Sequence, residues 1–516
     1  MMNLLIDPIF RVQTPEGPAT ANLPELLTLL GEDRIESLLG LQRHQEDAFH
    51  IFCCYLAGAV LIRQGETDPR QTAAFWLEGI RALTRQEGCE DDSAWMLVVD
   101  DPTKPAFMQP PASSKEVFEH DYKPKAATPD ALDVLQTARN HDVKSSRGSH
   151  AQAEQWILAL ISLNGMVGYV GAGNYGIARM NGGFGSRACV GWKKTARAGG
   201  RFIHDVGRLI HLRDSLLMEP YPYSNIGTVL TWLSVWDGEA GRSLSRLDPF
   251  FIETPRRVRM RRYDHAIQCL GATSRTAQVA ADQWNGNLGD PWTPIKTETN
   301  ESFTPNPSGF TPQLLRDILF SDGFAAAPMM IADGESGWVV LTARIRERRK
   351  GNPEGFHEAT IRVPAGARLP LFGRGAARDR LASLSKHGLD NASDVRQGLR
   401  NALFSLMEGG PEKINYDADQ VSKWVDSSTR LFLLNWSPHF FDWLWTTVDI
   451  PDDTEALRPW FNELRRLAQE TLDRATERAP QRHGRSYRAK TKAQGIFFGS
   501  LKKNFPHFME VTHDKS

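Results

Sequence analysis

The stretch AQAEQWILALISLNGMVGYVGAGNYGIARMNGGFGSR, residues 151–187, places a helical pattern directly before a glycine-rich loop. Apolar residues between 156 and 161 recur on one face of a helix, and the motif G-x-G-x-x-G begins at Gly171. A dinucleotide-binding fold needs a strand before such glycines, a helix after them and an acidic residue about 20 positions later. Here a helix precedes the glycines, more glycines follow, and no Asp or Glu occurs between Asn164 and Arg201. The stretch therefore argues against a dinucleotide-binding α/β fold.

The composition is that of an ordinary globular protein. The 516 residues allow two or three domains, and 41% of them are hydrophobic and 24% charged. The net charge of −1 gives no global attraction to nucleic acid. Five cysteines without a C-x-x-C spacing predict neither a disulfide framework nor a cysteine-based zinc site. The longest apolar run, residues 51–62, is too short to span a bilayer, and the first residues do not resemble a signal peptide. We therefore expect a cytoplasmic chain that does not contact membranes.

Hydrophobic periodicity predicts an α+β fold with two parts. Residues 1–370 read as a large mixed domain of helices and small antiparallel sheets, with helices over 23–64, a strand in AWMLVVD at 94–100 and a hairpin over 338–363. Residues 371–516 have long helical periods and predict an antiparallel helical bundle. Its expected helices are 375–408 (broken near Gly388), 417–447, 454–479 and 486–504.

The glycine loop has two possible interpretations. It is a surface loop whose backbone needs positive φ angles, or it approaches a polyanion closely through its bare backbone. A run of six cations, with no acidic residue among them, supports the second interpretation. They are Arg179, Arg187, Lys193, Lys194, Arg197 and Arg201. Three more basic clusters occur at 256–262, 344–350 and 482–492. Together they favour a polyanion track over four separate solvated faces.

The alternative of an enzyme rests on two dipeptides, His141-Asp142 and His204-Asp205, which could belong to an HD-type metal phosphohydrolase or nuclease. With 14 histidines, about one such dipeptide is expected by chance. The sequence contains no P-loop, H-E-x-x-H or G-x-S-x-G motif. We predict no catalytic residue, no bound metal and no cofactor.

Several segments resemble the CasA family, the large subunit of the type I-E CRISPR surveillance complex Cascade. They are NLLIDPIFRVQTPEG, LPELLTLLGEDRIESLLGLQRHQEDAFHIF, the block from NHDVKSSRGSHAQ to the glycine loop, PFFIETPRRVRMRR and RRKGNPEGFHE. The resemblance covers most of residues 3–365 and, more loosely, the helical part that follows. It implies a non-catalytic subunit that reads the protospacer-adjacent motif of double-stranded DNA in the minor groove. The subunit would also help open the duplex for pairing with the guide RNA, and it would recruit a helicase–nuclease.

The resemblance also implies DNA-contacting residues. It places Gly173, Asn174 and Tyr175 at the groove-reading loop and Arg275 as a separate basic reader. The loop itself adds Arg179, from the run of cations, and Asn181, whose amide can donate and accept hydrogen bonds. Lys350 and Asn352 fall at the tip of the hairpin, where a wedge would enter the opened base step. Lys144 and Arg147 match a family loop that approaches nucleic acid and neighbouring subunits. The expected partners are target DNA, the Cascade subunits that hold CRISPR RNA, and the helicase–nuclease. A scaffold subunit that reads no DNA motif remains an alternative beside the HD-type enzyme.

Overall fold

The computed structural model describes residues 2–133, 151–182, 185–263, 266–305, 308–332, 334, 336–346, 353–416, 419–479 and 483–509. Contacts divide the chain into two compact units, Met1–Thr311 with Ser321–Ile361, and Pro312–Phe320 with Arg362–Ser516. Helices and small sheets occur together, which confirms the α+β class. Among the described residues, no helix is both long and apolar enough to cross a membrane. The functional division at residue 370 stays a prediction.

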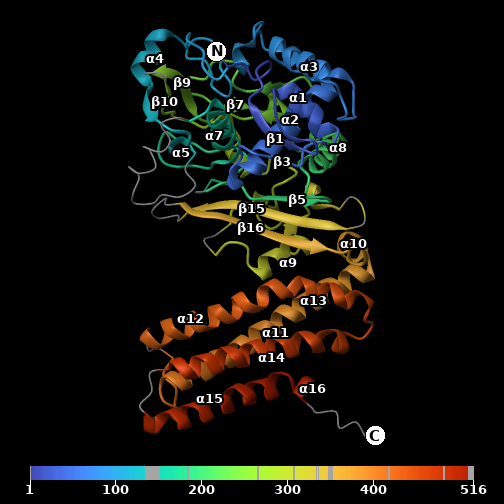
Figure 1. The fold of residues 1–516 in the computed structure, drawn as a ribbon, viewed down its shortest axis with the longest axis vertical. Coiled ribbons are helices and arrows are strands. Elements are labelled where there is room, and N and C mark those ends of the chain that lie inside the picture. Colours follow the sequence, from blue (N-terminus) through green and yellow to red (C-terminus); the bar gives the residue numbers. More distant parts are fainter. Residues whose placement is uncertain are drawn as a thin grey trace. The chain divides into compact units, whose positions relative to one another are not determined.

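Helix α2 (Glu46–Gln64) lies in the middle of the first unit, packed against its other long helices (Figure 1). Its residues from Phe49 to Leu61 are buried apart from His50, because its apolar residues surround the helix instead of forming one stripe. The other helices of this unit are α1 (Leu23–Gly31), α3 (Ala73–Gln86), α4 (Lys115–Asp121), α5 (Pro129–Leu132), α7 (Ala153–Met166) and α8 (Ala198–Leu216). The predicted helical stretch 23–64 is therefore two helices, with the short strand β3 (Ser37–Leu38) between them.

Within the described residues, the strands of the first unit form six small sheets. Three of them are antiparallel and three-stranded. The first has the order β2 (Gly17–Ala21), β1 (Phe10–Thr14), β3, and the second has the order β4 (Lys123–Ala126), β10 (Ala266–Ala272), β9 (Arg257–Tyr263). The third has the order β13 (Glu301–Ser302), β12 (Ile295–Lys296), β14 (Phe324–Ala325). A fourth has the order β16 (Pro353–Val363), β15 (Gly337–Arg346), β5 (Cys189–Lys193), with β15 antiparallel to β5. Two short pairs are parallel instead, β6 (Thr228–Leu230) with β8 (Leu247–Ile252), and β7 (Arg242–Ser243) with β11 (Val279–Ala280).

The predicted strand at 94–100 was wrong. The segment begins in a 3-10 turn, Asp92–Trp95, and continues as irregular backbone. Trp95 is fully buried and its Nε1 donates to Thr84 Oγ1 at 2.9 Å, while Leu97 N donates to Met2 O at 3.1 Å. The apolar run thus reflects burial against the N-terminal residues, which supply too few backbone partners for a ladder.

The second unit is built from helices. They are α9 (Pro312–Phe320), α10 (Ala365–Phe372), α11 (Ala376–Met407), α12 (Asp419–Trp436), α13 (Phe440–Thr446), α14 (Asp453–Arg478), α15 (His483–Asn504) and α16 (Pro506–Met509). The long helices α11, α12, α14 and α15 lie side by side, with α11 packed against the other three (Figure 1). This agrees with the helical bundle expected from the sequence, although the stretch 417–447 is two helices joined by a 3-10 turn.

Helix α11 continues through Gly388, where the sequence predicted a break. A Cβ atom at Gly388 would lie 2.5 Å from Cζ3 of Trp443, and Trp460 Nε1 donates to Gly388 O at 2.8 Å. The rings of Trp443 and Trp460 are stacked with centroids 4.9 Å apart. The glycine therefore makes room for a tryptophan pair, and this packing offsets its cost within a helix of about 1 kcal/mol.

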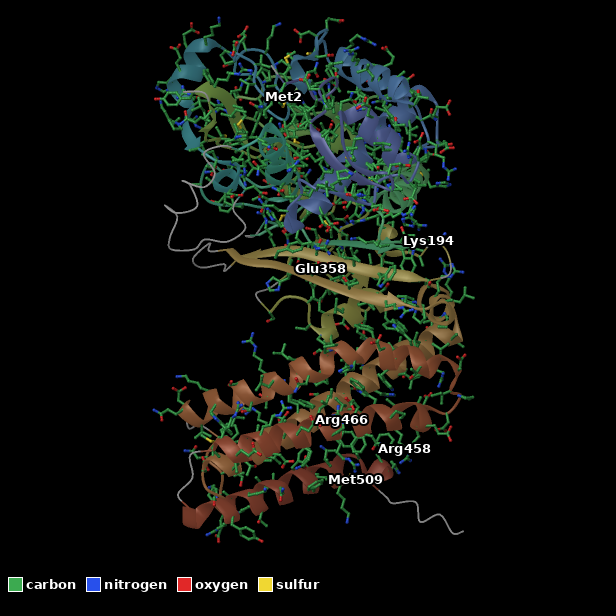
Figure 2. The ribbon with its side chains drawn as sticks, in the orientation of Figure 1. Met2, Lys194, Glu358, Arg458, Arg466 and Met509 are labelled. Atoms are coloured by element: carbon green, nitrogen blue, oxygen red, sulfur yellow. The ribbon has the colours of Figure 1, made fainter. Side chains whose placement is uncertain are left out.

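On the surface of the helical bundle, charged side chains form ion pairs and contacts between a cation and an aromatic ring. Arg466 on α14, labelled in Figure 2, pairs with Glu463 and Glu470 on the same helix. The guanidinium of Arg458 lies 5.6 Å from the ring centroid of Phe508. Exposed pairs of this kind contribute little to stability because water screens them.

A buried ion pair joins three elements of the first unit. Arg201 on α8 donates from Nη1 to Asp47 Oδ1 on α2 at 2.6 Å, and Thr342 on β15 donates to the other oxygen of Asp47. Both charged side chains are less than a tenth exposed. Burial by itself would raise the pKa of Asp47, but Arg201, Lys193 and Thr342 hold it well below its usual range.

Replacing Asp47 by alanine should destabilise the first unit by about 3–5 kcal/mol, because Arg201 would stay buried without its main partner. Hydrogen exchange followed by mass spectrometry on the full chain should show faster exchange in α2 and α8 and unchanged exchange in α14. Arg85→Ala is the control, since Arg85 pairs with Glu78 on the surface of α3. Unchanged exchange in α2 and α8 would contradict the role given to this pair.

Candidate functional site

The glycine loop follows α7, and its backbone has positive φ angles that favour glycine. Gly171, Gly173 and Gly182 have φ angles of 131°, 76° and 54°. A Cβ atom at Gly176 would lie 2.5 Å from the backbone carbon of Gly168, so the loop folds tightly back on its own first residues. Side chains at these positions would change the path of the backbone.

The tip of the loop is bonded to a segment 100 residues away in the sequence. Gly173 O accepts a hydrogen bond from Ser274 N at 3.1 Å, and Tyr175 Oη donates to Arg275 O at 2.7 Å. Asn174 N donates to Gly171 O at 2.9 Å, which closes the turn. The structure therefore brings Gly173, Asn174 and Tyr175 together with Arg275.

Two cations lie at this tip. The side chain of Arg275 is 81% exposed, and its Nη1 is 3.0 Å from Glu239 Oε2. Lys125 on β4 is exposed, and its Nζ donates to Asn174 Oδ1 at 3.1 Å. Sequence reasoning missed Lys125, although Lys123-Pro-Lys125 shows the alternation of an exposed strand face. We call Gly173, Asn174, Tyr175, Arg275 and Lys125 the loop-tip cluster.

Arg179 and Asn181 lie apart from the loop-tip cluster. Arg179 is 4% exposed, its guanidinium lies 3.8 Å from the ring centroid of Phe251, and its Nη2 donates to Phe251 O at 3.0 Å. Asn181 is half-buried and donates from N to Ser302 Oγ at 2.7 Å and from Nδ2 to Glu301. Both residues fasten the far end of the glycine loop to the body of the unit. We leave Arg179 out of the candidate surface because its charge does not face solvent.

Four other residues assigned to DNA, Lys144, Arg147, Lys350 and Asn352, lie outside the described residues, as does the dipeptide His141-Asp142.

Three of the four basic clusters are largely internal where the structure describes them, and the cluster 482–492 is not. Arg187 donates to Asp290 at 2.6 Å, and Arg256 donates to Gly168 O at 2.7 Å beneath the loop. The buried cations of these clusters are Arg179, Arg187, Arg201, Arg256, Arg257, Arg259 and Arg344. The exposed cations are Lys194, Arg197, Arg261, Arg262, Arg488 and Lys490. The expected continuous polyanion track is thus reduced to separate exposed cations, because most of these arginines pair with internal carboxylates and carbonyls.

A pocket lies beside the glycine loop. Its volume is about 370 Å³, and its walls are the loop residues 168–169, 175–178 and 180–182 and residues of the segment 277–286. The rings of Tyr169 and Tyr175, with centroids 6.1 Å apart, are among the groups that line it. The loop therefore has a hollow on one side and the bonded segment 273–275 against its tip.

A buried carboxyl group supports the loop from below. Ala178 N lies 2.9 Å from both carboxylate oxygens of Glu253, which is 3% exposed. Burial raises the pKa of Glu253 from 4.5 to about 7, against the opposing effects of Arg179, Ala178 N, Arg187 and Arg256. The support under the loop therefore titrates near neutral pH.

The dipeptide His204-Asp205 lies on α8, and both side chains are buried. Asp205 accepts hydrogen bonds from His50, His204 and Trp292, at 2.7, 2.7 and 2.9 Å. A phosphohydrolase needs its ligands open to substrate, whereas the Asp205 side chain is 0% exposed. This arrangement gives no support to the HD-type reading.

No family model matches the sequence, and no curated protein matches it either. Solved structures are similar over nearly the whole chain. The CRISPR-associated protein Cse1 from Acidimicrobium ferrooxidans has a TM-score of 0.64 at 12% identity, covering 99% of each chain. A CasA structure from Thermus thermophilus has a TM-score of 0.64 at 13% identity, covering 97% of this chain and 99% of its own. Cse1 from Thermobifida fusca has a TM-score of 0.63 at 13% identity, covering 99% of both. The predicted resemblance to CasA is thus confirmed for the fold.

Replacing Glu253 by glutamine should change how stability depends on pH. Because the folded pKa lies above the unfolded one, the contribution of Glu253 to stability is full below pH 4.5 and is lost as the pH rises through about 7. The variant keeps an acceptor for Ala178 N without a charge. Its free energy of unfolding should equal that of the parent near pH 4.5 and be about 3 kcal/mol larger at pH 8. Urea unfolding at both pH values tests this, with Glu78→Gln as an exposed control; parallel pH profiles for parent and variant would refute it.

Proposed function

We propose that this chain belongs to the CasA family and acts as the large subunit of a type I-E CRISPR Cascade complex, where it recognises a short motif in double-stranded target DNA. The observation that carries the proposal is the loop-tip cluster, in which the glycine loop meets Arg275, within a chain whose fold resembles that of CasA proteins along its length. The other Cascade subunits, with their CRISPR RNA, are the expected partners.

The chemistry of the loop-tip cluster suits the DNA minor groove. This groove is narrow, and its pattern of donors and acceptors is degenerate, so a thin backbone loop and a small amide fit it better than a helix. The amide of Asn174 both accepts and donates, and at present it bonds Lys125 and Ala172 O. A base edge would compete for these bonds. Lys125 and Arg275 would contact phosphates or the groove wall without specifying sequence.

A short motif is sufficient for such a protein. Guide RNA pairing reads the rest of the target, so the protein needs only a few base contacts and a means of opening the duplex. We assign the opening to the hairpin β15–β16, with Lys350 at the phosphates and Asn352 as the wedge. We also assign to this subunit the recruitment of a helicase–nuclease, which would make the cuts that this chain does not. Lys144 and Arg147 are proposed to approach nucleic acid or neighbouring subunits.

Asn174→Ala should weaken binding to targets with the correct motif by about 1–3 kcal/mol and leave binding to motif-free DNA nearly unchanged, because one base-edge contact is lost. The measurement is the affinity of the assembled complex for duplexes that differ only in the motif, at one salt concentration. Asn181→Ala is the matched control, since its amide bonds Glu301 away from the tip. Equal losses of affinity for both duplexes would favour the scaffold alternative, in which the loop contacts only the DNA backbone and reads no motif.

Lys350→Ala and Asn352→Ala should differ in kind. Lys350→Ala should reduce binding to every duplex and lower the salt slope by about one unit, because one phosphate contact is lost. Asn352→Ala should bind duplex normally but open it slowly, since a wedge acts between bases after docking. Permanganate reactivity of the assembled complex measures opening, and a pre-melted bubble should rescue only Asn352→Ala. Opening at the parental rate would place the wedge elsewhere.

A further inference from the structure

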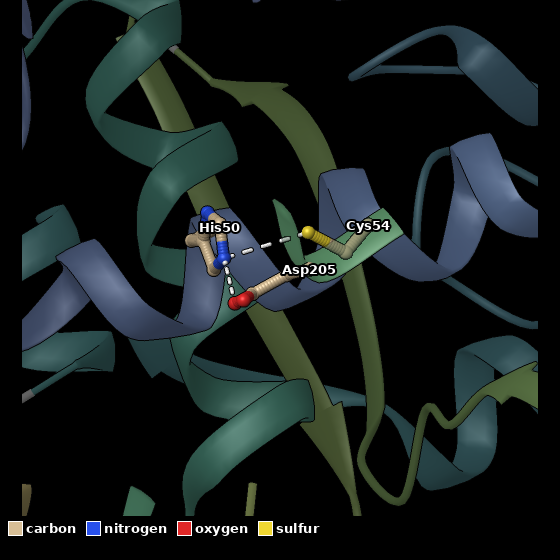
Figure 3. A group of neighbouring side chains, drawn as sticks. All are labelled: His50, Cys54 and Asp205. Atoms are coloured by element: carbon tan, nitrogen blue, oxygen red, sulfur yellow. Dashed lines mark hydrogen bonds and ion pairs between the residues drawn. The ribbon is translucent and has the colours of Figure 1, made fainter. Parts of the chain in front are cut away.

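Three potential metal ligands converge in the interior of the first unit, apart from the loop-tip cluster. His50 and Cys54 are four residues apart on α2, and Asp205 faces them from α8 (Figure 3). His50 Nε2 lies 2.7 Å from Asp205 Oδ2 and 3.5 Å from Cys54 Sγ. The three ligand atoms all lie within 4.8 Å of one another. An imidazole nitrogen, a thiol sulfur and a carboxylate oxygen are the donor types that zinc binds in proteins.

Within this group the hydrogen bond of Cys54 is the weak one, at 3.5 Å from His50 Nε2. The Nε2 atom of His50 carries at most one hydrogen, and both Asp205 and Cys54 face that one atom. If Nε2–H donates to the Asp205 carboxylate, the Cys54 sulfur can share that hydrogen only weakly. A single cation would interact with all three atoms at once, after the His50–Asp205 hydrogen bond of 2.7 Å opens to the distance of about 3.3 Å that separates two ligand atoms of a tetrahedral zinc ion.

The charges around the group are also consistent with a divalent ion. Arg201 and Asp47 neutralise each other at 2.6 Å. With Cys54 as a thiolate, Cys54 and Asp205 supply two negative charges, which match one divalent cation. The Arg201 Nε atom is 3.7 Å from Asp205 Oδ2, close enough to moderate the carboxylate without taking the place of a ligand.

Neighbouring groups hold Asp205 in position. His204 Nδ1 lies 2.7 Å from Oδ1 of Asp205, and Trp292 Nε1 donates to Oδ2 at 2.9 Å. Such outer contacts orient a ligating carboxylate before a metal arrives. The side chain of Asp205 is fully buried and that of His50 is 11% exposed. This burial suits an ion that joins α2 to α8 better than one that meets a substrate from solvent.

We propose that His50, Cys54 and Asp205 form a structural site for one zinc ion, which joins α2 to α8. Most structural zinc sites have four protein ligands; this one would have three, and a water molecule would complete the tetrahedron. The site departs from the sequence prediction of no bound metal, because its ligands come from residues more than 150 positions apart and form no spaced motif.

Cobalt(II) is the probe, since a cobalt–thiolate bond gives an intense near-ultraviolet charge-transfer band and tetrahedral cobalt gives strong visible bands. The protein is the full chain with Cys89→Ser, which removes a partly exposed thiol. After dialysis against chelator, we expect one cobalt per chain with both sets of bands, and displacement by zinc. Cys54→Ser should abolish the charge-transfer band and weaken binding at least tenfold. Cys53→Ser, at the adjacent buried thiol, should leave both unchanged.

A second measurement needs no ligand variant. Zinc should raise the thermal midpoint of the parent and slow alkylation of Cys54 under partial denaturation more than that of Cys53 or Cys189, because only Cys54 binds the ion while all three gain from the stabilised fold. Absence of stoichiometric cobalt binding, bands without thiolate character, or equal protection of all three cysteines would overturn the proposal. These outcomes do not depend on DNA binding, so the zinc site and the proposed function fail or stand separately.

Discussion

The ion pair between Arg201 and Asp47 lies where α2, α8 and β15 meet, and the arrangement of the first unit depends on it. A buried pair contributes little net stability compared with apolar residues of the same shape, but it is costly to break. Its effect is therefore to fix which elements meet. The pair of Arg344 with Asp133 does the same for β15 and the end of α5, and that of Arg187 with Asp290 for the end of the glycine loop.

These internal pairs explain why a chain with many arginines offers few of them to a polyanion. Each arginine that pairs with a buried carboxylate or carbonyl is removed from the surface, whatever its neighbours in the sequence suggest. The cations left at the glycine loop, Lys125 and Arg275, come from other segments and are already bonded to Asn174 and Glu239. Recognition there would exchange these bonds for bonds to DNA, so specificity can arise without a strongly basic surface.

The sequence predicted what periodicity and backbone chemistry determine locally. The stripe on α14, the strands β15 and β16 and the glycine loop were all recognisable from spacing. Three features were not, because each depends on a distant partner. Gly388 stays helical because Trp443 fills the space beside it, residues 94–100 lack a strand partner long enough for a ladder, and Arg179 is buried over Phe251. The candidate zinc ligands are the extreme case, since only the packing of α2 on α8 brings them together.

Solved structures with 12–13% identity share this fold over nearly the full chain, so the fold constrains few individual residues. In the glycine loop the constraint falls on the backbone: positive φ at Gly171 and Gly173, and the close approach of Gly176 to Gly168. A loop defined in this way presents a fixed shape, while its polar side chains are free to differ. Under the proposed function, motif preference would then depend on a position such as Asn174, whose side-chain amide bonds Lys125 and Ala172 O. This separation of shape from readout is what the comparison of Asn174→Ala with Asn181→Ala examines.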